Sequence, residues 1–217
     1  MSTPKRSTPS TAAPPNPAVF PPQTIFDYHR TIVGYHGTRR ATAARLVDGE
    51  SFGVSENDDD WLGHGVYFWE YAPQQAWWWA DRRYGPDDAA VVGATIRLGR
   101  CLDLLDPTNM NLLKAAHADM TTVLAVAGQH ARENANTHKY LDCDVFNYLH
   151  AQLARQDFRY ETCRAVFVPM RSGGGMARLW NRSGVFEGGH IQVCLREQRN
   201  ILAAWSVRRD GRYGKDK

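Results

Sequence analysis

The sequence predicts an α+β fold, in which short strands form a sheet and the helices between them cover it. Three observations lead to this prediction. The chain has 217 residues, 43% of them hydrophobic, which is enough for one core of ordinary domain size. Apolar, β-branched stretches alternate with stretches of helical periodicity, but in no regular strand–helix–strand repeat. Clusters of glycine and proline separate these stretches.

The N-terminal segment differs in composition from the rest of the chain. Residues 1–23 are rich in Ser, Thr, Pro and Ala and hold almost nothing apolar before Val19. Such a stretch cannot bury enough surface to offset the entropy lost on ordering. We therefore expect a disordered leader over 1–23 and a single folded domain over 24–217. Residues 107–155 are expected to form a helical insert that serves packing, acceptor contact or partner binding.

The first half of the domain is expected to hold three strands and two helices. Residues 40–47 carry apolar side chains at helical spacing, and Gly49 is placed to end that helix. Pro73 suits the first turn of the next helix, because its φ is already helical and its missing N–H would have no partner there. The predicted strands cover 31–36, 65–69 and 90–98, and the predicted helices cover 40–47 and 73–84.

The second half is expected to hold two longer helices and the closing strands. Residues 140–155 place Leu141, Val145, Leu149 and Leu153 at helical spacing. The predicted helices cover 107–128 and 140–155. Strands are predicted over 162–168, 190–195 and 201–207, with a short strand or extension at 102–105. We expect the strands at 190–195 and 201–207 to be neighbours in the sheet.

Bulk composition narrows the class of protein. The net charge of +3 permits a nucleic-acid partner without requiring one. The four cysteines form no C-x-x-C pair, so buried thiols are expected rather than a disulfide frame or a zinc site. No apolar run reaches the ~18 residues of a membrane helix, and the N-terminus lacks an apolar signal region. The sequence therefore predicts a cytoplasmic protein that does not engage a membrane.

Two short motifs and an aromatic run are candidates for chemistry. The segment 34–38, Gly-Tyr-His-Gly-Thr, puts a histidine at a strand end beside a glycine, which suits either a ligand cleft or a packed turn. The segment 61–68 joins two glycines to an aromatic pair and lacks the residues of a phosphate loop. The residues Trp77, Trp78 and Trp79 point about 100° apart on a helix, so they do not all share one face. Each feature alone is compatible with a structural role.

Taken together, the stretch from Tyr35 to Trp79 resembles the donor-binding half of poly(ADP-ribose) polymerase-like ADP-ribosyltransferases of the diphtheria-toxin type. That family carries a His-Gly-Ser/Thr motif, then a Gly-x-Gly-x-Tyr-Phe motif about thirty residues later. A second aromatic follows eleven positions after the motif tyrosine. Here the matching residues are His36-Gly37-Thr38, the segment 63–68 and Trp78. The resemblance implies the ADP-ribosyltransferase fold, a split mixed or antiparallel sheet flanked by helices.

The resemblance also implies a donor, NAD⁺, bound as co-substrate without a metal. His36 would hydrogen-bond a ribose hydroxyl, and the backbone of Gly37 would hold the nicotinamide carboxamide, an approach that a side chain there would obstruct. Tyr67 and Trp78 would sandwich the cationic nicotinamide ring, which gains from stacking and from cation–π attraction.

Four further residues belong to the donor site that the resemblance implies. Thr38 would contact the adenosine side of NAD⁺, and Gly65 and Phe68 complete the second motif. Arg39 is placed to face the pyrophosphate, although a solvated position at a helix start suits it equally well.

The third catalytic position departs from the family pattern. In polymerising members a glutamate near the start of a late strand completes the site, and Gln192 occupies that position here. An amide can hydrogen-bond a ribose hydroxyl but brings no charge to a developing cation. The departure indicates transfer of a single ADP-ribose, with His36, Tyr67 and Gln192 as the catalytic set. Glu187 and His190 are nearby substitutes for the missing carboxylate.

The sequence thus predicts an NAD-dependent mono-ADP-ribosyltransferase that modifies a macromolecular acceptor, either protein or nucleic acid, and releases nicotinamide. Its size and architecture resemble those of a small bacterial toxin or anti-phage effector, for which an antitoxin or inhibitor protein is the expected partner. Two other functions stay open. One is a non-catalytic module that binds NAD⁺ or ADP-ribose, which the glutamine favours. The other is an NAD-dependent RNA 2′-phosphotransferase, which would need basic residues in the site.

Overall fold

The computed structural model describes residues 28–135, 137–170 and 175–209, so the expected leader over 1–23 lies outside the described residues. The described residues form a seven-stranded mixed sheet, four α-helices and one 3₁₀ helix, which confirms the α+β class. The helices are α1 (Arg40–Val47), α2 (Pro73–Tyr84), α3 (Pro107–Val126), α4 (Tyr140–Ala154) and the 3₁₀ helix η1 (Gln198–Asn200). The strands are β1 (Tyr28–Arg39), β2 (Val66–Glu70), β3 (Ala89–Gly99), β4 (Cys101–Asp103), β5 (Thr162–Phe167), β6 (His190–Leu195) and β7 (Ile201–Ser206).

The sheet has the strand order β4-β5-β6-β2-β1-β3-β7, and its parallel pair is β4 with β5. The expectation that the last two strands are neighbours is wrong. Strand β6 lies between β5 and β2, whereas β7 pairs with β3 at the opposite edge. The chain crosses between them through η1, whose Asn200 is fully buried and donates to the Glu161 carboxylate at 3.1 Å. Apolar patterning identifies strands but not their partners, since pairing depends on distant residues.

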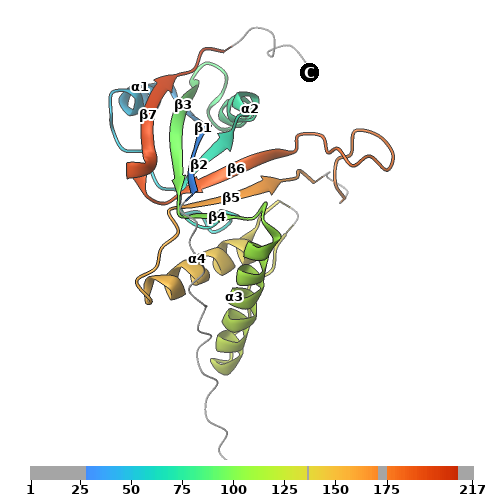
Figure 1. Ribbon diagram of the computed structural model, residues 1–217. Coiled ribbons are helices and arrows are strands. Elements are labelled where there is room, and N and C mark those ends of the chain that lie inside the picture. Colours follow the sequence, from blue (N-terminus) through green and yellow to red (C-terminus); the bar gives the residue numbers. More distant parts are fainter. Residues whose placement is uncertain (1–27, 136, 171–174, 210–217) are drawn as a thin grey trace, which may run out of the picture.

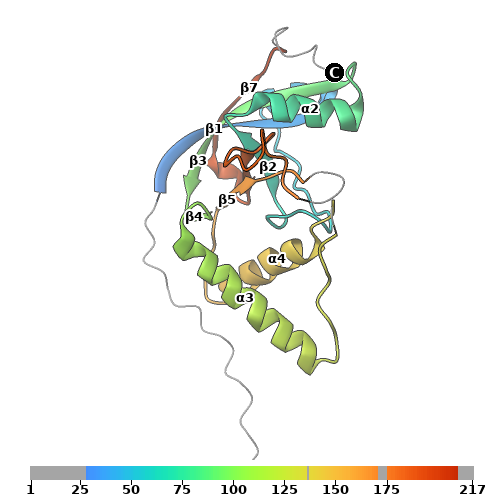
Figure 2. The same ribbon diagram turned by 90° about the vertical axis from the view of Figure 1, so that its right-hand side faces the viewer.

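The helices cover the sheet in two groups (Figures 1 and 2). Helices α3 and α4 lie together beneath the end formed by β4, β5 and β6, whereas α1 and α2 flank the other end. Each group buries its own apolar cluster. Leu149 of α4 and Leu112 of α3 pack with Cys163 of β5, and Ala76 and Trp77 of α2 pack with Val91 of β3.

A buried ion network connects β2, β4 and β5. Arg164 of β5 binds Glu70 of β2 through two hydrogen bonds of 2.6 and 2.9 Å, and it contacts Asp103 of β4 at 3.2 Å. Because these side chains are largely shielded from water, removing one partner would cost about 3–5 kcal/mol. The network therefore fixes β2 and β5 on either side of β6, which carries Gln192.

All four cysteines are buried free thiols, as expected. Within residues 28–135, 137–170 and 175–209, none of the helices combines the length and apolarity that a bilayer span requires.

Candidate functional site

A cavity of about 470 Å³ lies over β2, between α2 and the loops that precede β2 and follow α3. Six of the nine residues that the sequence singles out line it. They are His36, Gly37, Gly65, Tyr67, Trp78 and Gln192. These residues come from three strands, a turn and a helix, so the fold brings together positions that are more than 150 residues apart in the chain.

The floor of the cavity follows from the register of the sheet. Gln192 of β6 is opposite Trp69 of β2 and Ala165 of β5, and directly paired residues share a face. Tyr67 is two positions from Trp69 and Phe167 is two positions from Ala165, so their side chains project from that same face. All but Ala165 line the cavity.

The gap that holds the site opens where β1 and β2 part. Their register pairs Gly34 with Glu70 and Tyr35 with Trp69, and the pairing ends there. Strand β1 nevertheless continues to Arg39 along β3. His36 and Gly37 of β1 therefore have β3 on one side and the cavity on the other.

The backbone of Gly37 faces this gap. In an antiparallel strand, alternate residues turn their N–H and C=O groups to the same neighbour. The Val33 carbonyl of β1 accepts from the N–H of Tyr71 at 3.0 Å, so odd-numbered residues of β1 turn toward β2. Val91 is the β3 partner of Gly37. Its carbonyl faces away from β1 and accepts from the Val207 N–H at 3.1 Å, so it does not bond to Gly37. The N–H and C=O of Gly37 thus point into the cavity, one donor and one acceptor side by side.

The side chain of His36 fills the position where the strands separate. Its Nδ1 donates to the Tyr67 carbonyl at 2.9 Å, so the ring's other nitrogen, Nε2, is left as an acceptor. The ring also contacts Phe52 and Phe68, with centroids 5.4 and 5.6 Å away. Burial lowers the pKa of His36, against the hydrogen bond to Tyr67. The imidazole is therefore neutral near pH 7 and can accept a hydrogen bond from a ligand hydroxyl.

Tyr67 is held by its hydroxyl group. That oxygen accepts from the Leu62 N–H at 3.0 Å and donates to the Gly63 carbonyl at 2.8 Å. Burial raises the pKa of Tyr67 far above its ordinary value. The phenol therefore takes no part in proton transfer, and the cavity receives a fixed aromatic ring rather than an acid.

The three tryptophans of α2 have different environments. Trp77 is 9% exposed and packs in the core, whereas Trp78 is 58% exposed and lines the cavity. Trp79 also lines it and approaches β1 closely. A Cβ at Gly37 would come within 2.7 Å of the Ala76 carbonyl oxygen and 3.1 Å of the Trp79 ring. The close contact between β1 and α2 therefore requires a glycine at this position, whether or not a ligand also approaches it.

Gln192 belongs to a chain of hydrogen bonds. Its Oε1 accepts from the Trp61 indole at 2.7 Å, and its Nε2 is 3.0 Å from Nε2 of His190. Nδ1 of His190 is 2.6 Å from the Gly188 carbonyl, which can only accept. His190 is therefore protonated on Nδ1 and accepts from Gln192, which fixes both ends of the amide. Burial lowers the pKa of His190, consistent with a neutral ring.

Three predicted donor-site residues lie outside the cavity lining. Thr38 is buried, and Phe68 is fully buried in the apolar core against Phe52. Arg39 lies on the surface, 3.7 Å from Asp88, with its guanidinium over the Tyr84 ring. The pyrophosphate contact expected of Arg39 therefore has no support in its position.

The two residues predicted to replace the missing glutamate lie in different environments. His190 lines the cavity, whereas Glu187 is exposed in the preceding loop. Sequence reasoning missed the carboxylates of Asp59 and Asp60, which line the cavity from the loop before β2. Burial raises the pKa of Asp60, against hydrogen bonds from Ser55 and Asn57. Their clustering in the acidic stretch 56–60 was the available signal.

The charge of the lining suits a cationic group. Among the described residues that line the cavity, the charged side chains are Asp59 and Asp60, and none is lysine or arginine. The described residues hold no group of three histidine, cysteine, aspartate or glutamate side chains placed to bind a metal. No family model, curated protein or solved structure matches the chain.

Stability is expected to fall on mild acidification. The pKa values of His36, His190 and His150 are lowered in the folded chain, that of His150 to about 3, by burial foremost. Below the free-histidine value of 6.5 the unfolded chain binds protons that the folded chain excludes. The free energy of unfolding should therefore decrease between about pH 7 and about pH 5, by up to about 1.4 kcal/mol per pH unit for each histidine.

Urea denaturation across this range measures the slope. The variant His150→Leu should show a shallower slope than the wild type, and an exposed control, His117→Leu, should not. Equal slopes in all three proteins would contradict the assignment of a neutral buried His150.

Proposed function

We propose that the chain is an NAD-dependent mono-ADP-ribosyltransferase with an ADP-ribosyltransferase-type fold. One observation carries the proposal. The N–H and C=O of Gly37 face a cavity that Tyr67 and Trp78 also line, at the point where β1 parts from β2. A backbone donor and acceptor side by side match a primary carboxamide, and two aromatic side chains match a flat cationic ring. Nicotinamide in NAD⁺ combines both groups.

The chemistry follows from these contacts. The bond between the anomeric carbon of the ribose and the nicotinamide nitrogen breaks, and its electron pair leaves with nicotinamide. An oxygen or nitrogen of the acceptor then forms the new bond at that carbon and loses its proton to solvent. The Nε2 acceptor of His36 and the fixed amide of Gln192 can hold ribose hydroxyls in the reactive geometry. Catalysis would rest on positioning and on the negative charge of Asp59 and Asp60 near the developing cation.

Particular residues of the cavity bear on the two other functions. An RNA 2′-phosphotransferase needs cationic side chains around the donor, and none of the described lining residues is lysine or arginine. A non-catalytic NAD⁺ or ADP-ribose module is favoured by Gln192, whose amide is held by Trp61 and His190 where the family has a carboxylate. We propose the transferase because the cavity supplies carboxylates from another loop.

The deciding measurement is nicotinamide release when the full chain is incubated with NAD⁺ and cell extract. The NAD⁺ carries a label on its adenine. Release of nicotinamide together with transfer of that label to macromolecules supports the transferase. Binding of NAD⁺ by calorimetry without release would replace it with the binding module. Digestion with protease and with nuclease then shows whether the labelled acceptor is protein or nucleic acid. If the chain is a toxin, its inhibitor protein should suppress the release of nicotinamide.

Gln192→Ala should lower the rate of nicotinamide release by about fivefold, because a neutral hydrogen bond contributes about 1 kcal/mol. NAD⁺ affinity should change less than the rate, since the cavity's aromatic and backbone contacts remain. The control Gln152→Ala alters a glutamine of α4 outside the cavity and should behave as wild type. A rate for Gln192→Ala equal to that of the wild type would remove Gln192 from the site.

A further inference from the structure

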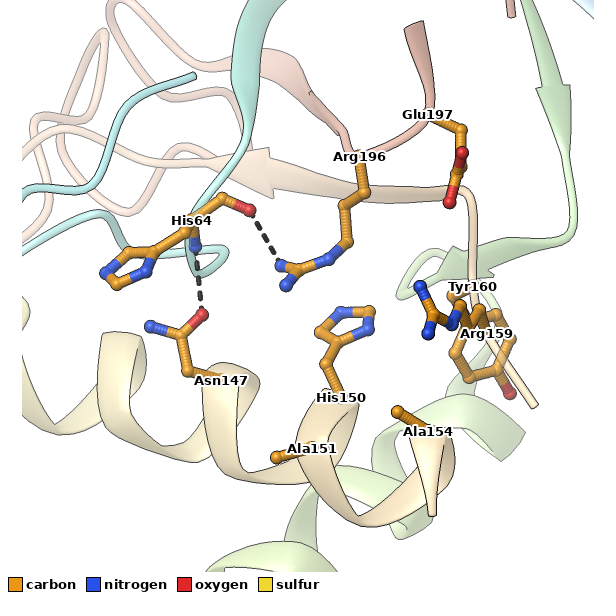
Figure 3. Close-up of a pocket in the computed structure, with 9 residues that line it drawn as sticks. All are labelled: His64, Asn147, His150, Ala151, Ala154, Arg159, Tyr160, Arg196 and Glu197. Carbon is orange, nitrogen blue, oxygen red and sulfur yellow. Dashed lines mark hydrogen bonds between the residues drawn. The ribbon is translucent and has the colours of Figure 1, made fainter. Parts of the chain in front are cut away.

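A second cavity, of about 450 Å³, lies between α4 and the turn from β6 into η1 (Figure 3). Its lining includes Arg159, Arg196, His150, His64 and Asn147, with Glu197 at one side. It is separated from the donor cavity by the turn before β2. His64 lines the second cavity, and its neighbour Gly65 lines the donor cavity.

Two guanidinium groups give this cavity its charge. Arg196 follows directly after β6, and one of its nitrogens, Nη1, donates to the His64 carbonyl at 2.7 Å. That bond fixes the group and leaves further N–H donors for a ligand. Arg159 forms no hydrogen bond or ion pair with another of the described residues, although it lines the same space. Figure 3 shows the His150 ring between the two arginine side chains.

His150 supplies a third polar group. The residue is 8% exposed, and its Nε2 lies 3.2 Å from Sγ of Cys163. Burial raises the pKa of Cys163 well above its ordinary value, so the thiol keeps its proton. With that S–H donating to Nε2, the neutral ring carries its own hydrogen on Nδ1. Burial, and after it the positive charge of Arg196, lowers the pKa of His150 to about 3.

The single carboxylate of the lining does not neutralise this charge. Glu197 lies 4.0 Å from Arg199, a cation outside the cavity. Arg196 and the exposed Arg159 both line this space, so a bound anion would be attracted to two cationic groups at once. Arginine forks match the oxygen geometry of a phosphate group and bind it by charge-assisted hydrogen bonds.

We propose that this second cavity is a binding site for a phosphate group, held by Arg159, Arg196 and His150. The cavity is larger than one phosphate needs, so the group would be carried by a nucleotide or by a nucleic-acid strand. The site does not depend on NAD⁺ chemistry. It can therefore be tested without the donor, and its failure leaves the proposed transferase activity untouched.

The test is a calorimetric titration of the full chain, without NAD⁺, with inorganic phosphate, adenosine monophosphate, adenosine and a short single-stranded RNA. Phosphate-bearing probes should bind, and adenosine should not. Arg159→Gln and Arg196→Gln should each weaken that binding by about tenfold or more, since each removes a charged hydrogen-bond partner. Arg155→Gln is the matched control, because Arg155 is an exposed cation at the end of α4 outside the cavity.

The His150 ring signals in an NMR titration provide the second readout, and they should shift with each probe that binds. Tighter binding of RNA than of the mononucleotide would identify a strand as the source of the phosphate, and the reverse would identify a small ligand. Arg159→Gln keeps the proposal testable if Arg196→Gln fails to fold. Absence of binding by every phosphate probe, or equal binding by wild type and Arg159→Gln, would overturn it.

Discussion

Replacing His36 with alanine is expected to lower nicotinamide release from NAD⁺ by about a hundredfold, the loss typical of a reactant misplaced by ~1 Å. The change removes the Nε2 acceptor for the ribose. It also removes the donor to the Tyr67 carbonyl, so the backbone beside Gly37 loses the contact that holds the gap in shape. Release is measured with saturating NAD⁺, and circular dichroism checks that the chain remains folded.

Two variants accompany this measurement. His36→Asn keeps a short side-chain N–H that can reach the Tyr67 carbonyl, so part of the rate should return. His117→Ala removes an exposed histidine of α3 and should leave the rate unchanged. If His36→Ala releases nicotinamide as fast as the wild type, the cavity beside β1 is not the donor site.

The adjacent tryptophans of α2 should respond in opposite ways. Trp77→Ala should cost about 3–5 kcal/mol of stability, because it leaves a void in a packed core. Trp78→Ala should change stability by about 1 kcal/mol or less, since the ring is 58% exposed and its contact with the Arg82 guanidinium is at the surface. It should instead weaken NAD⁺ binding by about tenfold, the value of a stacked aromatic contact of ~1.4 kcal/mol.

Urea denaturation and calorimetric titration of both variants separate the two effects. Trp77→Ala is titrated with NAD⁺ at a low urea concentration, at which the denaturation curve gives the folded fraction. Unchanged NAD⁺ affinity in Trp78→Ala would contradict the stacking role of that side chain. A large loss of stability in Trp78→Ala would show that the ring packs more closely than its exposure indicates.

Much of the local structure could be predicted from the sequence. Helices α1 and α2 begin and end at the expected residues, because Gly49 and Pro73 act on their own neighbourhood. The six predicted site residues that line one cavity lie in local features of the sequence, namely two short motifs, an aromatic run and a late strand. What failed was the strand order. The position of β7 depends on its pairing with β3, and no local signal encodes that partner.

The rest of the site depends on contacts between distant segments. The bond from Trp61 to Gln192 joins residues 131 positions apart, and neither residue alone indicates it. The carboxylates of Asp59 and Asp60 occur in a polar stretch that reads as a solvated loop. Phe68 was predicted to bind the donor but lies outside the cavity lining. The alternation of side chains along β2 turns Phe68 to the apolar face, while its neighbour Tyr67 faces the cavity.

The open end of the pairing between β1 and β2 bears on how such a pocket can change over evolutionary time. Its proposed contacts to the carboxamide are main-chain atoms, whose hydrogen bonds do not depend on the chemistry of the surrounding side chains. Side chains around it can therefore be exchanged while those contacts persist, provided that the strands still part at the same residue. Two proteins of common descent could then share few identical residues in such a pocket. What they would keep is the length over which the two strands pair.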